Sequence, residues 1–313
     1  MKLIQGDSLE VMKALPDNSV DAVVTDPPYN IGKAEWDKIP DYIEWCGKWI
    51  LECQRVLKDT GSFYFFHNDM EQVADLILWI RKNTNFIFKQ FIVWNKRFDG
   101  AKNKGFLDGF VVPEGLRNYQ KMAEYCLFYT FQDETGLTTI FNSRDCFQSI
   151  KNYLRAERKK SGLTLDEINM VVGTVSMAGK HYFADSQWGM PIKEHYEKLQ
   201  TTGYFSREYE DLRREYEDLR YTFNNQKTHH SVWNYEIARR SEHVTPKPVD
   251  LIENIIYHST NEGDTVLDPF TGSGTTGVSC VHTGRHFIGI DKDIAIATRR
   301  IEDTDPLFQA VGL

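Results

Sequence analysis

Two hydrogen-bond acceptors and an aromatic ring lie together in Asp26-Pro27-Pro28-Tyr29, directly after the predicted strand DAVVT at residues 21–25. Proline fixes φ and carries no N–H, so the turn is stiff and presents the Pro27 carbonyl at the end of a predicted strand. Such a turn offers a ligand a carboxylate, a carbonyl oxygen and a ring. Taken alone, the same sequence is equally typical of a plain turn between a strand and a helix.

A glycine motif, G-x-G-x-x-G at Gly272, Gly274 and Gly277, lies between a predicted strand and a predicted helix. Glycines let the backbone approach a ligand, and Asp291, about 20 residues further on, is placed to bind ribose hydroxyls. We therefore expect a nucleoside-like cofactor. No Gly-Lys-Ser/Thr follows, and Asp268 before the first glycine would repel a pyrophosphate but suits a cationic or amino-bearing ligand.

The two motifs lie far apart in the sequence, so a shared sheet is needed to bring them together. The pattern of the rest of the chain predicts such a sheet. Apolar runs that read as strands alternate with amphipathic helices in the first and last parts of the sequence. Strands separated by helices favour a mainly parallel sheet, whose ligands gather at the carboxyl ends of the strands. The expected fold class is α/β and Rossmann-like, with a mixed, mostly parallel sheet and a helical insertion.

Composition divides the chain into three segments. Between residues 142 and 242 the apolar runs shorten and charges rise, which predicts the insertion. Its first part resembles the helix-turn-helix modules of small DNA-binding regulators, with Thr164 before a helix and Gly173 at the turn. A plain helical subdomain fits the pattern equally well. Residues 1–141 and 243–313 are expected to form the two halves of one α/β domain.

The composition is that of a globular protein. With 313 residues, 41% of them apolar, the chain can form one large α/β domain with an insertion, or two small domains. The N-terminus lacks a signal-peptide pattern and no run of about 18 apolar residues occurs, so we expect a cytoplasmic protein without a membrane partner. The five cysteines form no C-x-x-C pair and no H-E-x-x-H occurs, so we expect neither disulfides nor a metal.

The two motifs, in this order, resemble a known family. TDPPY looks like the catalytic motif of the amino-group DNA methyltransferases, and HVTPKPVDLIENIIYHSTNEGDTVLDPFTGSGTTG followed by GRHFIGID looks like their S-adenosylmethionine-binding region. In the group called β, the catalytic motif comes first, a target-recognition region lies in the middle and the cofactor motif comes last, as in this sequence. The resemblance covers about residues 1–130 and 230–300.

The resemblance implies a cofactor, a substrate and a set of site residues. The cofactor is S-adenosylmethionine, the substrate is double-stranded DNA, and residues 142–242 are the target-recognition region. Catalysis is assigned to Asp26, Pro27, Pro28 and Tyr29. Cofactor binding is assigned to Asp7, Lys247, Asp268, Phe270, Gly272, Gly274, Thr275 and Asp291. Asp7 is alternatively a helix cap and Lys247 a solvated lysine. Family members often dimerise, so we also expect a homodimer.

This assignment explains how the Asp-Pro-Pro-Tyr turn could activate an exocyclic amine. An exocyclic amine such as adenine N6 is a poor nucleophile because its lone pair is delocalised into the ring. Asp26 and the Pro27 carbonyl can each accept one N–H, which frees the lone pair for in-line attack on the sulfonium methyl. The base must first leave the duplex, at a cost of a few kcal/mol, and stacking on Tyr29 recovers about 1 to 3 kcal/mol.

Basic residues in two stretches are candidates for contacts with DNA phosphates. They are Lys96, Arg97, Arg155, Arg158, Lys159 and Lys160. An ordinary solvated face is the alternative. The net charge of −8 argues against polyanion binding by the whole surface.

The acceptor base is expected to be adenine, because an aspartate at the head of the motif favours adenine N6 by family habit. Cytosine N4 is the nearest alternative, whereas methylation of a cytosine ring carbon is disfavoured because the sequence has no Pro-Cys dipeptide. More distant alternatives are an RNA base-amine methyltransferase and a DNA-binding regulator with a degenerate methyltransferase body. A nicotinamide oxidoreductase would explain the glycine motif but gives no role to the Asp-Pro-Pro-Tyr turn.

Overall fold

The computed structural model describes residues 1–313 except 34, 102–116, 118, 120, 132–146, 185–187, 225–229, 239–245 and 306–313. The chain divides into two compact units, one formed by Met1–Phe131 with Thr222–Leu313 and the other by Gln132–Tyr221. None of the helices in the described ranges is long and apolar enough to cross a membrane.

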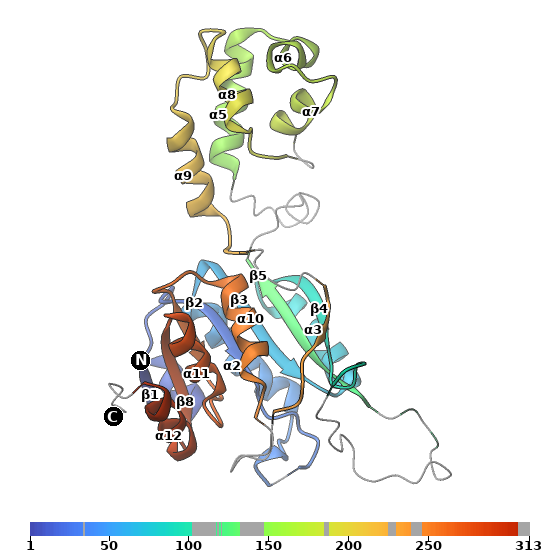
Figure 1. Ribbon diagram of the computed structural model, residues 1–313, viewed down its shortest axis with the longest axis vertical. Helices are drawn as coiled ribbons and strands as arrows, with labels where there is room; N and C mark the ends of the chain where they lie inside the picture. Colours follow the sequence, from blue (N-terminus) through green and yellow to red (C-terminus); the bar gives the residue numbers. More distant parts are fainter. Residues whose placement is uncertain are drawn as a thin grey trace. The chain divides into compact units, whose positions relative to one another are not determined.

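The first unit is built on a sheet that has eight strands among the described residues, in the order β1-β8-β7-β2-β3-β5-β4-β6 (Figure 1). The strands are β1 (Lys2–Gln5), β2 (Val20–Thr25), β3 (Leu57–His67), β4 (Ile87–Asn95), β5 (Ala123–Thr130), β6 (Val232–Asn234), β7 (Thr265–Asp268) and β8 (His286–Asp291). All neighbouring pairs are parallel except those of β5, which runs antiparallel to both β3 and β4. The predicted mixed, mostly parallel sheet is confirmed.

Helices cover both faces of this sheet. The first unit contains α1 (Ser8–Lys13), the short 3-10 helix η1 (Glu35–Asp37), α2 (Tyr42–Val56), α3 (Met70–Asn83), α10 (Val249–Ser259), α11 (Thr275–Thr283) and α12 (Ala295–Thr304). Successive side chains of a strand point to opposite faces. In β3, Phe63 packs against Trp49 of α2, whereas the hydroxyl of Tyr64 accepts a hydrogen bond from Ser259 of α10. Helices α2 and α10 therefore lie on opposite faces, with α10 in front of the sheet in Figure 1.

The core beneath α1, α2 and α3 is rich in aromatic rings. Trp49 is fully buried, and its ring meets Phe63, Phe65 and Phe270 edge-on at centroid distances of 5.4 to 6.1 Å. Edge-to-face pairs of this kind contribute about 0.5 to 1.5 kcal/mol each beyond the burial of their area. Phe270, which was predicted to bind the cofactor, joins the glycine motif to the core in this structure.

A buried hydrogen-bond network holds the proline turn that follows β2. The Tyr42 hydroxyl donates to the Pro28 carbonyl at 2.7 Å and lies 3.0 Å from Nε2 of His67. The backbone N–H of Asp69 donates to Nδ1 of His67 at 3.1 Å, so Nε2 carries the ring proton. Because His67 is fully buried, its pKa is lowered to about 4, and the ring is neutral at pH 7.

The second unit is helical and has its own core. Its helices are α5 (Gln148–Ser161), α6 (Leu165–Val172), α7 (Met177–Phe183), α8 (Lys193–Gln200) and α9 (Tyr209–Leu219). Thr164 and Glu167 form a capping box at the start of α6, and Gly173 ends it at φ 82°. The helix predicted after Thr164 and the turn predicted at Gly173 are confirmed, and α6 and α7 follow each other as in a helix-turn-helix.

The end of the helical unit differs from the predicted boundary at residue 242. The compact unit ends at Tyr221, and β6 pairs in parallel with β4 in the sheet of the first unit. A strand of three residues is too short to show a period, so the sequence pattern did not separate it from the insertion. The other predicted boundary, at residue 142, lies outside the described residues.

The network around His67 predicts acid sensitivity. The unfolded chain binds a proton at this histidine below about pH 6.5, whereas the folded chain does so only near pH 4. Falling pH therefore favours unfolding, and wild type should lose about 3 kcal/mol of unfolding free energy between pH 6.5 and 4 relative to His67→Gln. Urea titrations of both proteins across this range measure the difference. His282→Gln, at a surface histidine, should behave like wild type; parallel curves for wild type and His67→Gln would show that His67 is not the cause.

Candidate active site

The acidic residues singled out in the sequence converge on one edge of the sheet. Asp7 and Asp26 closely follow β1 and β2, and Asp268 and Asp291 end β7 and β8. These four strands are parallel, so their carboxyl ends meet. Strand β5 runs the other way, and its first residues, which include Glu124, lie at this same edge.

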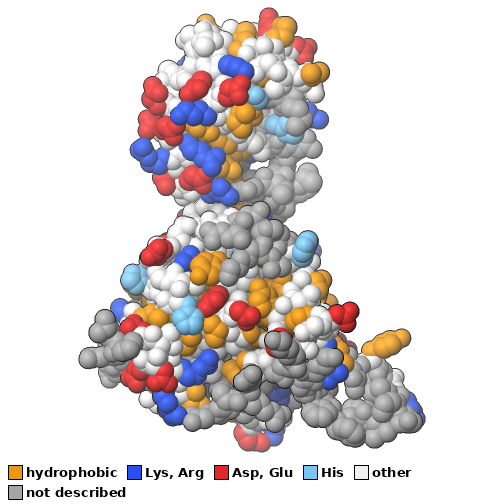
Figure 2. All heavy atoms as spheres, viewed as in Figure 1, with side chains coloured by type: hydrophobic (Ala, Val, Ile, Leu, Met, Phe, Trp, Pro, Cys, Tyr) orange, Lys and Arg blue, Asp and Glu red, His pale blue; other side chains and the backbone are white. Residues whose placement is uncertain are grey.

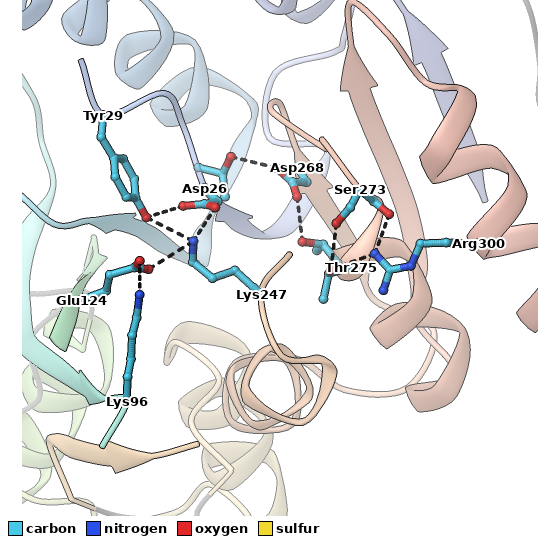
Figure 3. Close-up of polar contacts among 11 residues, drawn as sticks. Asp26, Tyr29, Lys96, Glu124, Lys247, Asp268, Ser273, Thr275 and Arg300 are labelled. Carbon is cyan, nitrogen blue, oxygen red and sulfur yellow. Dashed lines mark hydrogen bonds and ion pairs between the residues drawn. The ribbon is translucent and has the colours of Figure 1, made fainter. Parts of the chain in front are cut away.

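Asp26 and Tyr29 of the proline turn contact a lysine from the far end of the sequence. The Tyr29 hydroxyl donates a hydrogen bond to Oδ1 of Asp26, and the Lys247 ammonium donates one to Oδ2 (Figure 3). Lys247 Nζ also lies 3.2 Å from the Tyr29 hydroxyl. Lys247 was predicted to bind the cofactor, but in this structure it lies against the catalytic motif.

Glu124 and the residue that follows β4, Lys96, complete the charge cluster. Glu124 Oε1 accepts from the Lys96 ammonium, and Oε2 lies 3.3 Å from Nζ of Lys247 (Figure 3). Glu124 was not predicted from the sequence, because a single acid at the start of an apolar strand carries no pattern. Lys96 was predicted to contact DNA phosphates, but its side chain is only 13% exposed and its ammonium is paired with Glu124.

Burial and charge set the ionisation of this cluster. Burial opposes ionisation of Glu124, but Lys247 and Lys96 outweigh it and lower its pKa to about 2. Burial likewise acts to lower the pKa of Lys247, yet Asp26 and Glu124 raise it above the ordinary value. Burial, followed by the charge of Asp26, raises the pKa of Tyr29, which therefore stays protonated and donates. At neutral pH the cluster holds charges of both signs.

The loop after Tyr29 is fixed by one buried carboxylate. Asp37, only 1% exposed, accepts hydrogen bonds from the backbone N–H groups of Asn30, Ile31 and Lys33 at 2.7, 3.1 and 3.0 Å. Three such bonds satisfy a carboxylate that would otherwise be costly to bury. The segment that carries Tyr29 is therefore held in one conformation. Asp37 was not predicted from the sequence either, because it lies in a polar stretch without a motif.

The glycine motif forms a tight loop between β7 and α11. Gly274 has φ 77°, and a Cβ there would come within 2.8 Å of the Ala297 Cα, so only glycine fits. The Gly272 N–H donates to Asp291 Oδ2 at 2.7 Å. Arg300 of α12 donates to the Ser273 carbonyl at 2.7 Å and lies 3.2 Å from the hydroxyl of Thr275, whose side chain is buried.

Asp268 links this loop to the catalytic strand. Its buried carboxylate accepts from the Thr25 hydroxyl at 2.8 Å, the Thr276 hydroxyl at 2.7 Å and the Phe270 N–H at 3.1 Å. Burial raises its pKa to about 7 in spite of these bonds. All three donors belong to the chain, so Asp268 holds the loop in shape, and direct contact of its carboxylate with the cofactor stays a prediction.

The side chains around the loop fit S-adenosylmethionine. Asp7 caps α1 by accepting from the Leu9 N–H, and its other oxygen lies 3.4 Å from Lys292. Asp7 and Asp291 are acceptors suited to the hydroxyl and amino groups of a nucleoside, and carboxylates would repel a phosphate. No group of three or more potential metal ligands occurs among the described residues.

The basic residues of α5 have several environments. Arg155 donates to the carbonyls of Phe183 and Ala184, so it caps the end of α7. The Arg158 guanidinium lies 5.4 Å from the centre of the Phe183 ring. Lys160 is exposed and pairs with Glu157, and Lys159 is exposed, as is Arg97 in the first unit.

Surface charge on the helical unit is mixed on the face seen in Figure 2, where acidic and basic side chains alternate. Arg207 pairs with Glu215, and Lys193 pairs with Glu210. Each of these basic side chains is therefore balanced by an acidic partner.

Comparison with known proteins identifies relatives over almost the whole chain. A sequence model described as DNA methylase matches residues 20–301. The chain is 29% identical over 313 aligned residues to DNA adenine methyltransferase YhdJ of Escherichia coli (strain K12), covering 96% of this chain and 82% of YhdJ. It is 26% identical over 319 aligned residues to Type II methyltransferase M.HpaI of Haemophilus parainfluenzae, covering 99% and 77%.

The fold also matches solved structures. The protein TTHA0409 of Thermus thermophilus, crystallised with S-adenosyl-L-methionine, aligns with a TM-score of 0.54 at 20% identity, over 100% of this chain and 99% of that one. This likeness confirms the predicted Rossmann-like fold class. With the proline turn and the glycine loop at one edge of the sheet, and the family matched over residues 20–301, this chain belongs to the DNA methylase family.

Proposed function

We propose that this protein transfers a methyl group from S-adenosylmethionine to the exocyclic N6 amine of adenine in DNA. The observation that carries the proposal is the hydrogen bond of 2.8 Å between Thr25 and Asp268. Thr25 directly precedes Asp26, and Asp268 begins the segment that leads into the glycine loop. This bond therefore fixes the catalytic turn beside the loop expected to hold the cofactor.

The side chains of the turn are suited to activate an amine. Asp26 and the Pro27 carbonyl offer acceptors for the two N–H groups, and the Tyr42 contact on Pro28 keeps the turn rigid. Holding both N–H groups in place positions the nitrogen without a covalent intermediate. When bound, S-adenosylmethionine supplies an electrophilic methyl group. Gly272 and Gly274 form the neighbouring loop, and Asp291 accepts a hydrogen bond from the Gly272 N–H, which supports a role for these three in cofactor binding.

The target base is adenine because the motif begins with aspartate and because YhdJ, a relative with 29% identity, is named an adenine methyltransferase. Cytosine N4 presents the same kind of amine and is distinguished by the product. A base stacked inside a duplex cannot present its amine to a carboxylate within the enzyme, so the target base must flip out of the stack. A homodimer and a cytoplasmic location are predictions from the sequence.

Target recognition is proposed for the helical unit. Helices α6 and α7 have the order of a helix-turn-helix, in which the second helix enters the major groove. Arg155 orients the end of α7, whereas Arg158 and Lys159 are the candidates for phosphate contacts. Arg97 is a further candidate from the first unit.

Asp26→Asn should abolish methyl transfer, because the amide cannot accept a charged hydrogen bond in place of the carboxylate. Labelled S-adenosylmethionine is incubated with unmethylated genomic DNA, and the nucleosides are analysed. We expect N6-methyladenine from wild type and a loss of at least about 100-fold in the variant. Asp41→Asn, at an exposed aspartate, is the matched control. Labelled N4-methylcytosine would replace the base assignment, and absence of label despite cofactor binding would overturn the DNA methylation proposal.

Lys159→Ala should weaken DNA binding in a salt-dependent way. Each phosphate contact that is lost lowers the slope of log affinity against log salt by about 0.9. Fluorescence anisotropy with a labelled duplex at several salt concentrations measures this slope. Lys193→Ala removes a lysine that already pairs with Glu210 and should leave the slope unchanged. Equal slopes in all three proteins would remove Lys159 from the DNA-binding surface.

A further inference from the structure

Both carboxylate oxygens of Asp26 are occupied in this structure. Oδ1 accepts from the Tyr29 hydroxyl and Oδ2 accepts from the Lys247 ammonium. The proposed function requires that Asp26 accept an N–H of the target base. Each oxygen keeps a second lone pair, but the ammonium on Oδ2 opposes the positive charge that develops on the amine nitrogen during transfer, so the reaction favours a site in which Lys247 has left Asp26.

The Lys247 ammonium cannot simply be released into the protein interior. The side chain is only 8% exposed, and removing a buried charge from its partner costs several kcal/mol. Tyr29 cannot replace the carboxylate, because its hydroxyl is neutral. A second carboxylate must lie within reach of Nζ for the lysine to leave Asp26.

Glu124 provides that carboxylate. Its Oε2 atom is buried, accepts no hydrogen bond from the described residues and lies 3.3 Å from Lys247 Nζ. A movement of well under 1 Å would bring Nζ to the usual distance of about 2.8 Å for such a bond. The other oxygen of Glu124 is held by Lys96, so Oε2 has a fixed position.

We propose that Glu124 is a positioning residue for methyl transfer, because it takes over the Lys247 ammonium when the amino group of the target base binds Asp26. This inference rests on the proposed function. In the resting site, the Lys247 ammonium lies on Asp26 and offsets its charge. In the loaded site, Glu124 is bound by both lysines and Asp26 is available to the base.

The transfer of the ammonium also changes the electrostatics at the reacting nitrogen. The amine nitrogen becomes positively charged as it gains the methyl group, until it loses one of its two protons. A carboxylate beside it stabilises that charge, whereas an ammonium at the same place opposes it. When Lys247 moves to Glu124, the negative charge of Asp26 is no longer offset by the ammonium and can stabilise the positive charge on the amine nitrogen.

Lys96 keeps Glu124 ready for this exchange. Together with Lys247 it holds the pKa of Glu124 at about 2, so the carboxylate is ionised before the base arrives. A protonated Glu124 would not accept a second ammonium.

Glu124→Gln tests the exchange, because the amide cannot take over a charge. Single-turnover transfer to genomic DNA should fall about 100-fold, while the Kd for S-adenosylhomocysteine stays within about threefold. Between pH 7 and 9 the variant's rate should rise about tenfold per pH unit, since deprotonation of Lys247 releases Asp26. Wild type should change little over this range.

Glu124→Gln/Lys247→Met is the decisive variant. It removes one charge of each sign, and with no ammonium left on Asp26 the rate should recover to within about tenfold of wild type and lose its rise with pH. If Glu124→Gln fails to fold, this double variant carries the test alone. A folded double variant that is as slow as, or slower than, about one hundredth of wild type overturns the proposal.

Controls separate this inference from the proposed function. Glu52→Gln changes a half-buried glutamate that pairs with Arg55 in α2, and should keep the wild-type rate and pH profile. An inactive wild type would count against DNA methylation itself. An active wild type with a pH-independent Glu124→Gln would retain the function and reject the exchange of Lys247.

Discussion

A buried ammonium must have a carboxylate beside it, and the active site is organised around this constraint. Lys247 is almost fully enclosed and lies between Asp26 and Glu124. These three residues come from the turn after β2, from β5 and from the segment before α10. Leaving any one of these charges unpaired would be costly, so the ion pairs hold the three segments together. Lys96 pairs with Glu124 and balances the second negative charge. Lys247 thereby fixes Asp26 at the start of the proline turn. Tyr42, which also contacts His67, fixes the turn at the Pro28 carbonyl.

The sheet brings together two motifs that lie far apart along the chain. The catalytic turn lies near the N-terminus and the glycine loop near the C-terminus, yet β7 pairs in parallel with β2. The two loops therefore leave neighbouring strands at the same edge, and the bond between Thr25 and Asp268 connects them directly. A chain can carry a separate helical unit between these halves because that unit has its own core and its own helix caps.

Rigidity in this site is built from backbone and buried polar groups. Asp37 binds three N–H groups of the loop after Tyr29, Asp268 binds three donors around the glycine loop, and Arg300 binds a carbonyl of the same loop. Each of these contacts fixes a loop without using the acceptor groups of the proline turn. Positioning of this kind suits a reaction in which the protein orients an amine and makes no covalent bond to it.

The sequence by itself determined the fold class, because strand and helix periods are local properties. The resemblance of its two motifs to known methyltransferases indicated the family, and it predicted roles for the residues of the proline turn and the glycine loop. The sequence also predicted the helix start at Thr164 and the turn at Gly173. Only the tertiary structure decided which charges are paired. Lys96 read as a surface lysine and Glu124 as an ordinary acid, since pairing depends on the reversed direction of β5 and on strand neighbours far apart in sequence. The short strand β6 was missed for the same reason: three residues have no period, and only their pairing with β4 defines them.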